Sequence, residues 1–295
     1  MLVFSNMLWM IKTVIHKKSL ISILLVFLTC SFCFGQSQDL LLSPTAASGD
    51  SITFIQIRTD TLFHSKQIMS LLVLPKKNFS RFHLEIGYSK SDLKPTSFFV
   101  MSKNAVAAIN GSYFDRDNGG SVTYLEIHDT VISRTRPSNL KWAKPVSLIN
   151  GAIVIGKDSS VLIEPAKTDQ FYEQSNNEIA VLVSGSLLLY NSQLLELPKM
   201  ELVTDRNPRT CLCETKESLA FITIDGRRKE AAGMSLAETQ QYLKKIGCVD
   251  ALNLDGGGST TMWIKGKGIV NYPSDSSGER PVANALLIIK NVIGR

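Results

Sequence analysis

The stretch Ala251–Trp263 (ALNLDGGGSTTMW) holds the least ordinary combination of residues in the chain. A short apolar segment leads directly to the carboxylate of Asp255, which is followed by glycines and hydroxyl-bearing residues. These followers are Gly256, Gly257, Gly258, Ser259 and Thr260. Consecutive glycines let backbone N–H groups converge on an anion, and hydroxyls add donors to phosphate or sugar oxygens. The stretch therefore predicts an anion-binding or catalytic loop; a tight glycine turn capped by Asp255 is the simpler alternative.

A second strand-like segment ends in polar residues within Ala105–Asp115 (AVAAINGSYFD). Asn110 and Gly111 come first, and Tyr113, whose ring can stack on a sugar face, follows before Asp115. An Asn-Gly pair is also a common hairpin turn. Because no matching strand returns until after residue 121, we expect instead a longer loop that binds a sugar.

Two arginines stand in further short motifs, NPRT (Asn207–Thr210) and TIDGR (Thr223–Arg227). The planar guanidinium groups of Arg209 and Arg227 suit bidentate contact with phosphate, and Thr210 adds a hydroxyl. We expect these side chains, together with the glycine loop, to bind a phosphate.

Asp225 follows an apolar strand in the same way as Asp255. If the two side chains converge, they form the pair of catalytic carboxylates used in glycoside hydrolysis, although a plain Asp-Gly turn explains Asp225 equally well. A last patch, Glu279–Asn284 (ERPVAN), supplies Arg280 and Asn284, which we expect on the sugar side.

Strands must position most of these side chains. Runs of β-branched and aliphatic residues predict strands over 52–58, 68–74, 82–88, 122–128, 152–155, 161–163, 179–183, 219–224 and 285–289. Two helices are expected, over 96–102 and 236–246; Ser235 and Glu238 form a capping-box pattern for the second, which Gly247 ends. The prediction is an α+β fold: a strand-rich single domain over 51–295, with a mixed sheet and few helices, after an N-terminal lead at 36–50.

Residues 1–35 have the features of a secretory signal peptide. Three lysines precede the apolar run Leu20–Phe34, and Cys33 and Gly35 place small residues where signal peptidase cleaves. The run is shorter than the roughly 20 residues of a spanning helix. We expect cleavage after Gly35, a secreted or periplasmic protein and no stable membrane span. A permanent anchor, a lipid anchor on Cys30 or Cys33 and a true start at Met10 are alternatives.

The charge balance argues against a nucleic-acid partner. The 295 residues, 44% of them hydrophobic, suffice for a buried core, and 32 basic against 26 acidic residues give a net charge of +6. Residues 1–35 contain three lysines and no acidic residue, so the remaining chain carries 29 basic against 26 acidic residues. We therefore expect local positive charge in a pocket.

Histidine and cysteine usage narrows the chemistry further. The four histidines, His16, His64, His83 and His128, all lie outside the motifs, which disfavours a histidine-based triad or a His-rich zinc centre.

Three cysteines follow residue 35. Cys211 and Cys213 are expected on one face of a strand, too close in sequence to bridge each other. We expect the three cysteines to be small buried hydrophobic residues; a bridge from Cys248 to either of the others is the alternative.

Six of these segments, in this order, resemble the phosphodiester glycosidase family between about residues 104 and 290. They are NGSYFD, NPRT, TIDGR, GMSLAE, ALNLDGGGSTTM and RPVANALLI. The chain departs from the family pattern at Ser112, where a second glycine is usual, at Asn207, where histidine is usual, and at Cys211–Cys213, where small residues normally follow. The change at Asn207 removes a possible acid or phosphate ligand, so the mechanism transfers less safely than the fold.

The resemblance implies a secreted glycoside hydrolase that cleaves an N-acetylglucosamine-like sugar from a sugar-1-phosphodiester, leaving free sugar and a phosphomonoester. It gives no certain cofactor. Two other functions stay open: a non-catalytic module that binds phosphorylated or acidic glycan, and a phosphodiesterase that uses a divalent cation held by Asp115, Asp225 and Asp255 as hard oxygen ligands. Which aspartate is nucleophile or base depends on the carboxylate separation.

Overall fold

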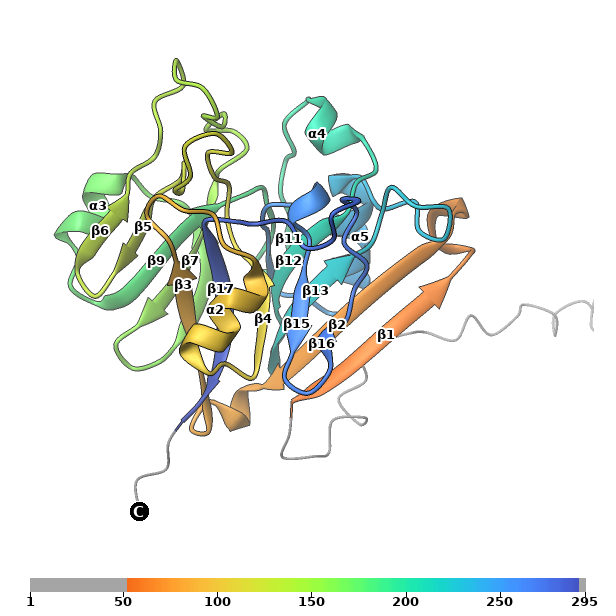
Figure 1. Cartoon of the computed structure of the whole chain (residues 1–295), viewed down its shortest axis with the longest axis horizontal. Helices are drawn as coiled ribbons and strands as arrows, with labels where there is room; N and C mark the ends of the chain where they lie inside the picture. The colour runs from red at the N-terminus through yellow and green to blue at the C-terminus, as the bar shows by residue number, and fades with distance from the viewer. Residues whose placement is uncertain (1–51, 292–295) are drawn as a thin grey trace, which may run out of the picture. The chain divides into compact units, whose positions relative to one another are not determined.

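The computed structural model describes residues 52–291. The predicted signal peptide and the whole N-terminal lead lie outside these residues. Within them, the strands form three sheets and the helices are few, so the strand-rich α+β class is confirmed (Figure 1). No helix of the described part is long and apolar enough to cross a bilayer.

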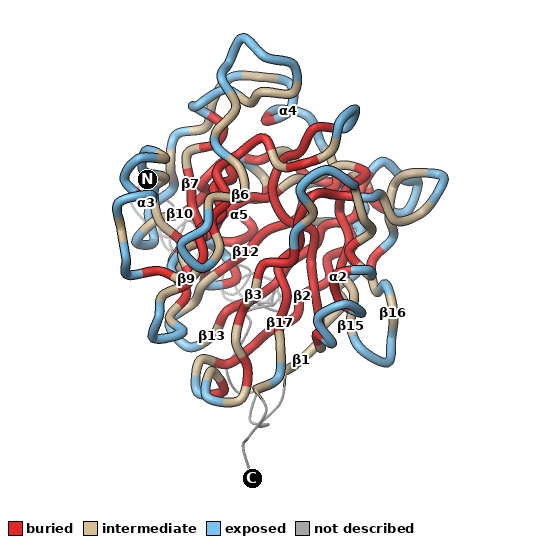
Figure 2. Tube along the Cα trace, turned by 60° about the vertical axis from the view of Figure 1, so that its left-hand side comes forward, coloured by how far each residue is buried: buried red, intermediate tan, exposed pale blue. Residues whose placement is uncertain are grey.

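The largest sheet has seven strands and carries most of the motifs. Its order is β1 (Thr53–Thr59), β2 (Gln67–Pro75), β13 (Ser218–Ile224), β12 (Arg209–Glu214), β14 (Asp250–Asn253), β10 (Leu187–Tyr190) and β11 (Gln193–Leu194). The β2 strand is buried along its whole length. Its side chains alternate between two core clusters, with Met69, Leu71 and Val73 in one and Leu72 and Leu74 in the other. The sheet is therefore covered on both faces (Figure 2).

Two five-stranded sheets complete the strand layers. The first has the order β16 (Gly268–Ile269), β15 (Met262–Ile264), β4 (Ala107–Asn110), β17 (Asn284–Lys290) and β3 (Phe82–Tyr88). The second has the order β6 (Thr130–Ser133), β5 (Leu125–Ile127), β9 (Glu178–Ser184), β7 (Gly151–Gly156) and β8 (Val161–Pro165). Aliphatic side chains from all three sheets meet in one core cluster, among them Ile109, Leu182, Leu212 and Leu286.

Helices close two outer faces of these sheets. The α2 helix (Thr96–Lys103) packs Phe99 and Val100 on β4 and β17, whereas α5 (Leu236–Lys245) packs Leu236 and Leu243 against the seven-stranded sheet. Ser235 accepts from the Glu238 backbone while Glu238 accepts from the Ser235 backbone, which confirms the expected capping box. Two short helices that the sequence did not predict are α3 (Asp169–Gln174) and α4 (Glu201–Thr204).

Two expectations about the scaffold are corrected. Instead of a mixed sheet, all strand pairs within 52–291 are antiparallel; a parallel pair needs a long crossover connection, usually a helix, and helices are few here. Cys213 and Cys248 form a disulfide between β12 and the segment after α5, so Cys211 is the one free thiol among residues 52–291, and it is buried. The sequence left this bridge open because it does not reveal which strand lies beside residue 248.

Candidate active site

The antiparallel order brings three motifs to one edge of the seven-stranded sheet. Arg209, at the start of β12, pairs with Ile224 at the end of β13, and Cys211 pairs with Asn253 at the end of β14. The segments after β13 and β14 therefore emerge beside the start of β12. In the neighbouring sheet Asn110 of β4 pairs with Ala285 of β17, so the NGSYFD and RPVAN segments are neighbours as well.

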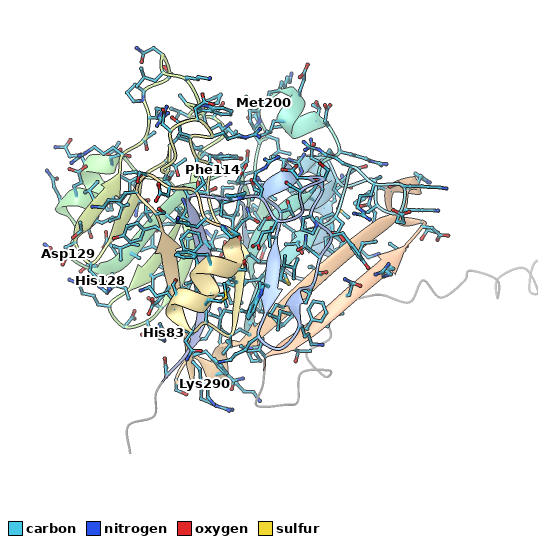
Figure 3. The ribbon with its side chains drawn as sticks, viewed as in Figure 1. His83, Phe114, His128, Asp129, Met200 and Lys290 are labelled. Carbon is cyan, nitrogen blue, oxygen red and sulfur yellow. A yellow bond between two sulfur atoms is a disulfide. The ribbon has the colours of Figure 1, made fainter. Side chains whose placement is uncertain are left out.

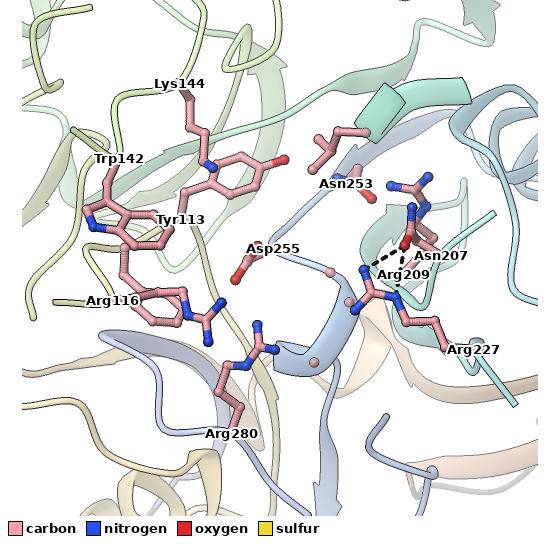
Figure 4. Close-up of a pocket in the computed structure, with 15 residues that line it drawn as sticks. Tyr113, Arg116, Trp142, Lys144, Asn207, Arg209, Arg227, Asn253, Asp255 and Arg280 are labelled. Carbon is pink, nitrogen blue, oxygen red and sulfur yellow. Dashed lines mark hydrogen bonds between the residues drawn. The ribbon is translucent and has the colours of Figure 1, made fainter. Parts of the chain in front are cut away.

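A pocket of about 250 Å³ lies at this edge (Figure 4). Of the residues expected to bind or react, those lining it are Tyr113, Arg209, Arg227, Asp255, Gly256, Gly257, Gly258 and Arg280. Phe114, which follows Tyr113 in the NGSYFD segment and was expected with it as a stacking ring, lines the pocket as well. Lining residues that the sequence did not single out are Arg116, Trp142, Lys144, Leu202 and Asn253, together with Asn207, which was noted only as a departure from the family pattern. Among the described residues that line it, five are cationic and one, Asp255, is a carboxylate.

Asp255 stands at the centre of the pocket and is only partly exposed (Figure 4). Burial raises the pKa of its carboxyl group above the usual range, and the Ser259 hydroxyl and the charges of Lys144 and Arg280 oppose that rise. The cations thus offset part of the cost of burying the carboxylate form in a partly dry site. Such a group can act as a nucleophile or as a base.

The glycines after Asp255 serve close packing more than the expected N–H cradle. The N–H of Gly257 donates to Pro208 O, and those of Ser259 and Thr260 donate within the loop, so three expected anion donors are already used. A Cβ on Gly258 would lie 2.0 Å from the Arg280 guanidinium, and one on Gly257 would lie 3.2 Å from that of Arg227. Gly257 also has φ of +60°. The glycines therefore let two arginines pack directly against the loop.

Arg209 and Arg227 lie on one side of the pocket, together with Asn207 (Figure 4). Arg209 is buried and donates to the backbone oxygens of Met234 and Asp205; burial lowers its pKa to about 10, which leaves it a cation at neutral pH. Arg227 donates from Nε and Nη2 to Asn207 Oδ1, at 3.0 and 2.7 Å. At the position where the family pattern has histidine, Asn207 thus orients a guanidinium group.

Arg116, Lys144 and Arg280 lie on the other side of Asp255 (Figure 4). Arg280 makes two hydrogen bonds with Asp275, at 2.7 and 2.9 Å. Arg116 lies over the Trp142 ring and Lys144 over the Tyr113 ring, at 5.9 and 5.2 Å from the centroids. Within 52–291 neither of these two cations has a carboxylate partner.

Aromatic side chains form the wall beside these cations. Tyr113 lies almost wholly within the protein, and its hydroxyl donates to Gly185 O over 2.7 Å. The Trp142 indole N–H donates to Asp117 Oδ2 over 3.0 Å, which fixes the ring at the pocket rim. Asn253 contributes a buried Oδ1 that has no hydrogen-bond partner within the described part of the chain. This oxygen is available to accept from a ligand hydroxyl.

Several residues expected to touch the ligand lie beneath the pocket. Asn110 is fully buried; it donates to Asp255 O and accepts from the hydroxyl of Thr210 and the N–H of Thr261. Thr210 is committed to that bond, and Ser259 and Thr260 are buried as well. Asn110 and Thr210 join the loops beneath the pocket, whereas the Ser259 and Thr260 side chains lie buried in the glycine loop. None of the four lines the pocket, which corrects their expected direct contact with phosphate or sugar.

Gly111 and Asn284 also support the site from below. Asn284 Oδ1 accepts from the Ser112 N–H over 2.7 Å, and a Cβ on Gly111 would lie 2.0 Å from that oxygen. Asn284 is fully buried, so it binds the turn after β4 and makes no contact with the pocket. Gly111 and Asn284 were expected to bind the sugar; both lie beneath the pocket and neither lines it, which corrects that expectation.

Asp115 is occupied in a turn. It accepts from the N–H groups of Asp117 and Asn118 and from Arg136, at 2.6 to 3.0 Å, and these bonds lower its pKa despite its burial. Because Asp117 in turn holds Trp142, this turn positions the aromatic wall. Asp115 therefore supports the wall of the pocket without lining the pocket itself, and the expected sugar contact is corrected.

Asp225 does not line the pocket that contains Asp255. It is buried, and its Oδ1 accepts from the N–H of Tyr272 and the side chain of Asn271. Asn271 also donates to Thr260 O and accepts from the Met262 N–H, which ties Asp225 to the end of the glycine loop. Burial raises the pKa of Asp225 to about 6. The expected pair of converging carboxylates is therefore replaced by one carboxylate in the pocket and one behind its loop.

The arrangement of the acidic side chains decides whether the site could hold a divalent cation. Within 52–291 no group of three or more His, Cys, Asp or Glu side chains is arranged to hold an ion. Asp115 and Asp225, which the metal-dependent alternative requires beside Asp255, are engaged in separate networks. The set does not fit a divalent cation.

The described histidines lie away from the site. None of His64, His83 and His128 lines the pocket. In Figure 3, His83 and His128 are well separated from Phe114, which does line it. The site thus has the groups to bind an anion and to place one carboxylate beside it, without imidazole chemistry.

A strand-rich α+β domain with a cationic pocket around one aspartate defines an anion-binding site equipped for acid–base or nucleophilic chemistry. The family model described as phosphodiester glycosidase matches residues 103–289, more than half of the chain. The chain therefore belongs to the phosphodiester glycosidase family. The matched range contains all the residues that line the pocket.

Curated relatives share this region at low identity. The mouse N-acetylglucosamine-1-phosphodiester alpha-N-acetylglucosaminidase is 26% identical over 176 residues, which are 57% of this chain and 33% of the mouse protein. The YomE protein of Bacillus subtilis is 34% identical over 84 residues, 28% of this chain and 13% of that protein. The aligned part thus spans about a third or less of these relatives.

Solved structures support the fold. The catalytic domain of the zebrafish N-acetylglucosamine-1-phosphodiester alpha-N-acetylglucosaminidase superposes with a TM-score of 0.65 at 18% identity, covering 82% of this chain and 83% of that one. A hypothetical protein from Synechocystis gives 0.60 at 14% identity, covering 82% and 62%. At these identities the similarity establishes the arrangement of strands and helices only.

Proposed function

We propose that the protein is a glycoside hydrolase that cleaves a sugar-1-phosphodiester into free sugar and a phosphomonoester. The observation that carries the proposal is the position of Asp255: it is the single carboxylate among the described residues lining a pocket with five cations. Family membership supports the same class of reaction.

Charge stabilisation on the leaving group is the main catalytic effect in this proposal. When the bond between the anomeric carbon and the phosphate oxygen breaks, the electron pair leaves with the phosphomonoester, whose charge rises. Arg209 and Arg227, held by Asp205, Met234 and Asn207, are already oriented for that charge. Because a phosphomonoester leaves far more readily than a sugar alcohol, the reaction does not require the strong acid that a second carboxylate would supply.

Asp255 acts at the anomeric carbon, the other atom of the bond that breaks. As a carboxylate it attacks the anomeric carbon, or it removes a proton from the water that attacks there. Water supplies the hydroxyl of the released sugar in both cases. Asp225 takes no part in either step of the proposal, because it lies behind the glycine loop.

The sugar is proposed to be N-acetylglucosamine-like. Support comes from the names of the mouse and zebrafish relatives, which specify that sugar. The partly exposed Trp142 ring offers an aromatic face for the sugar, and Asn253 Oδ1 offers an acceptor for a hydroxyl.

Export from the cytoplasm is part of the proposal. Its support is the signal-like sequence of residues 1–35, which lies outside the described residues, and the Cys213–Cys248 disulfide. Disulfides persist mainly in oxidising compartments. We therefore place the working enzyme in the periplasm or outside the cell.

The experiment that tests the activity is incubation with the methyl diester of N-acetylglucosamine 1-phosphate and detection of released reducing sugar. We expect release by the native chain and loss of at least about 1000-fold in Asp255→Asn, a size typical of removing an essential catalytic group. The control is Asp129→Asn. Asp129 is exposed, and asparagine tolerates the left-handed backbone conformation at this position. A native chain that binds the diester without releasing sugar would instead be a glycan-binding module.

A further inference from the structure

The pocket holds more positive charge than one phosphodiester can balance. Of its five cations, Arg280 is neutralised by Asp275. The other four, Arg116, Lys144, Arg209 and Arg227, have no ion-pair partner among the described residues. A phosphodiester carries one negative charge and Asp255 carries another. Like charges gathered in one partly dry site repel, and an anionic ligand relieves that repulsion.

The four unpaired cations form two clusters on opposite sides of Asp255 (Figure 4). Arg209 and Arg227 make up the first cluster, beside the glycine loop. Arg116 and Lys144 make up the second, against the Trp142 and Tyr113 rings. Because Asp255 acts at the anomeric carbon, the sugar ring must lie at Asp255, between the clusters. One cluster then faces the phosphate and the other faces the far side of the sugar.

The chain fixes the second cluster in place. Trp142, on which Arg116 rests, is held by Asp117, and Lys141 makes an ion pair with the same carboxylate. Lys144 lies near enough to Asp255 to lower its pKa. The partly exposed Trp142 ring beside these cations suits a sugar that carries an acidic group, since the sugar contacts the indole while the acid meets the charge.

From this geometry we propose that the preferred substrate is a sugar-1-phosphodiester whose sugar carries a second acidic group, bound by Arg116 and Lys144. The inference rests on the proposed function for the position of the sugar. The acidic group is a phosphate ester or a carboxylate on the sugar, both of which pair with guanidinium and ammonium groups.

Binding to the Asp255→Asn chain tests this independently of turnover. The probes are the methyl diester of N-acetylglucosamine 1-phosphate, the same compound with a 6-phosphate, and its 6-carboxylate (uronic acid) form, titrated by calorimetry. We expect one acidic form to bind at least about tenfold more tightly than the neutral form, as a charge-assisted hydrogen bond provides. The form that gains more identifies the acid. Equal affinity of all three probes would overturn the proposal.

Variants of the second cluster locate the effect. In the Asp255→Asn background, Arg116→Met and Lys144→Met keep the aliphatic packing on the rings and remove the charge. Each should reduce the preference for the acidic probe about tenfold, whereas Lys216→Met, an exposed lysine outside the pocket, should not change it. A preference that survives in the double variant Arg116→Met/Lys144→Met would overturn the assignment. Absence of turnover in the native chain would refute the proposed function alone, because this preference is measured without catalysis.

Discussion

The side-chain amide of Asn110 donates to the backbone oxygen of Asp255 over 2.6 Å, across 145 residues of sequence. The other end of the same amide accepts from Thr210 and Thr261. One buried side chain therefore joins the NGSYFD, NPRT and DGGGST segments. This explains why these three motifs occur together: each provides a hydrogen-bond partner that another needs.

Replacement of Asn110 by alanine should destabilise the fold and the site together. The change leaves Asp255 O, the Thr210 hydroxyl and the Thr261 N–H without their partner in a buried place. We expect a loss of about 2–4 kcal/mol in the free energy of unfolding, measured by urea denaturation. The exposed Asn177→Ala serves as the control. An Asn110→Ala chain as stable as the native one would contradict the role assigned to this amide.

The Cys213–Cys248 bridge should contribute measurably to stability. It joins residues 35 apart, and closing a loop of that length in the unfolded chain is worth about 3–4 kcal/mol in the loop-entropy description. Reductant should therefore lower the urea midpoint of the native chain. The double variant Cys213→Ala/Cys248→Ala should show no response to reductant. A native midpoint that is insensitive to reductant, under conditions that fully reduce the unfolded chain, would refute the prediction.

Asp225→Asn should be stabilising at neutral pH. The folded pKa of Asp225, about 6, lies above the unfolded value, so its contribution to stability is fully present below the unfolded pKa and is lost as pH rises through about 6. Asparagine preserves the acceptor for Asn271 and Tyr272 without the charge. The difference in unfolding free energy between the variant and the native chain should therefore grow by roughly 2–3 kcal/mol as the pH rises from 4 to 7, in favour of the variant.

The same variant distinguishes the two aspartates. Since Asp225 supports the loop from behind, Asp225→Asn should keep most of the hydrolytic activity that Asp255→Asn loses. If Asp225→Asn lost as much activity as Asp255→Asn while its stability was unimpaired, Asp225 would have to take part in the reaction.

The pH dependence of hydrolysis should report the Asp255 carboxylate. Its pKa is raised by burial, so kcat/KM should fall with decreasing pH at higher values than for an ordinary aspartate. Lys144→Met removes a positive charge that favours the carboxylate, and should move this acid limb to higher pH. Lys216→Met should leave it in place. A limb that moves to lower pH in Lys144→Met would contradict the sign of the interaction.

The sequence predicted most of the scaffold because the signals were local. A nearly continuous apolar run marks β2, alternating apolar residues mark β3, and Ser235 with Glu238 marks the start of α5. It also predicted that polar residues at strand ends would share one site. In the structure β13 and β14 flank β12 and are both antiparallel to it, so their ends do lie at the same edge of the sheet. The register that places residue 248 beside Cys213 depends on long-range packing, which no local pattern specifies.

Residue types alone could not show which residues line the pocket and which support it from beneath. An asparagine that binds a sugar and one that joins two loops look alike in sequence; Asn110 and Asn284 prove to be the second kind. Asp225 and Asp255 follow strands in the same way, yet only Asp255 opens into the pocket. Trp142 and Lys144 were missed because the irregular segment between β6 and β7 carries no motif, and only its hydrogen bonds to the Asp117 turn bring it to the site.

Hydrolysis in water enriched in oxygen-18 tests the central claim most directly, because it identifies the bond that breaks. If Asp255 directs water to the anomeric carbon, with Arg209 and Arg227 stabilising the departing phosphate, the C–O bond is cleaved. Mass spectrometry of the products from a sugar-1-phosphodiester should then find the label in the sugar and none in the phosphomonoester. Label in the phosphomonoester would mean attack at phosphorus and would contradict the account.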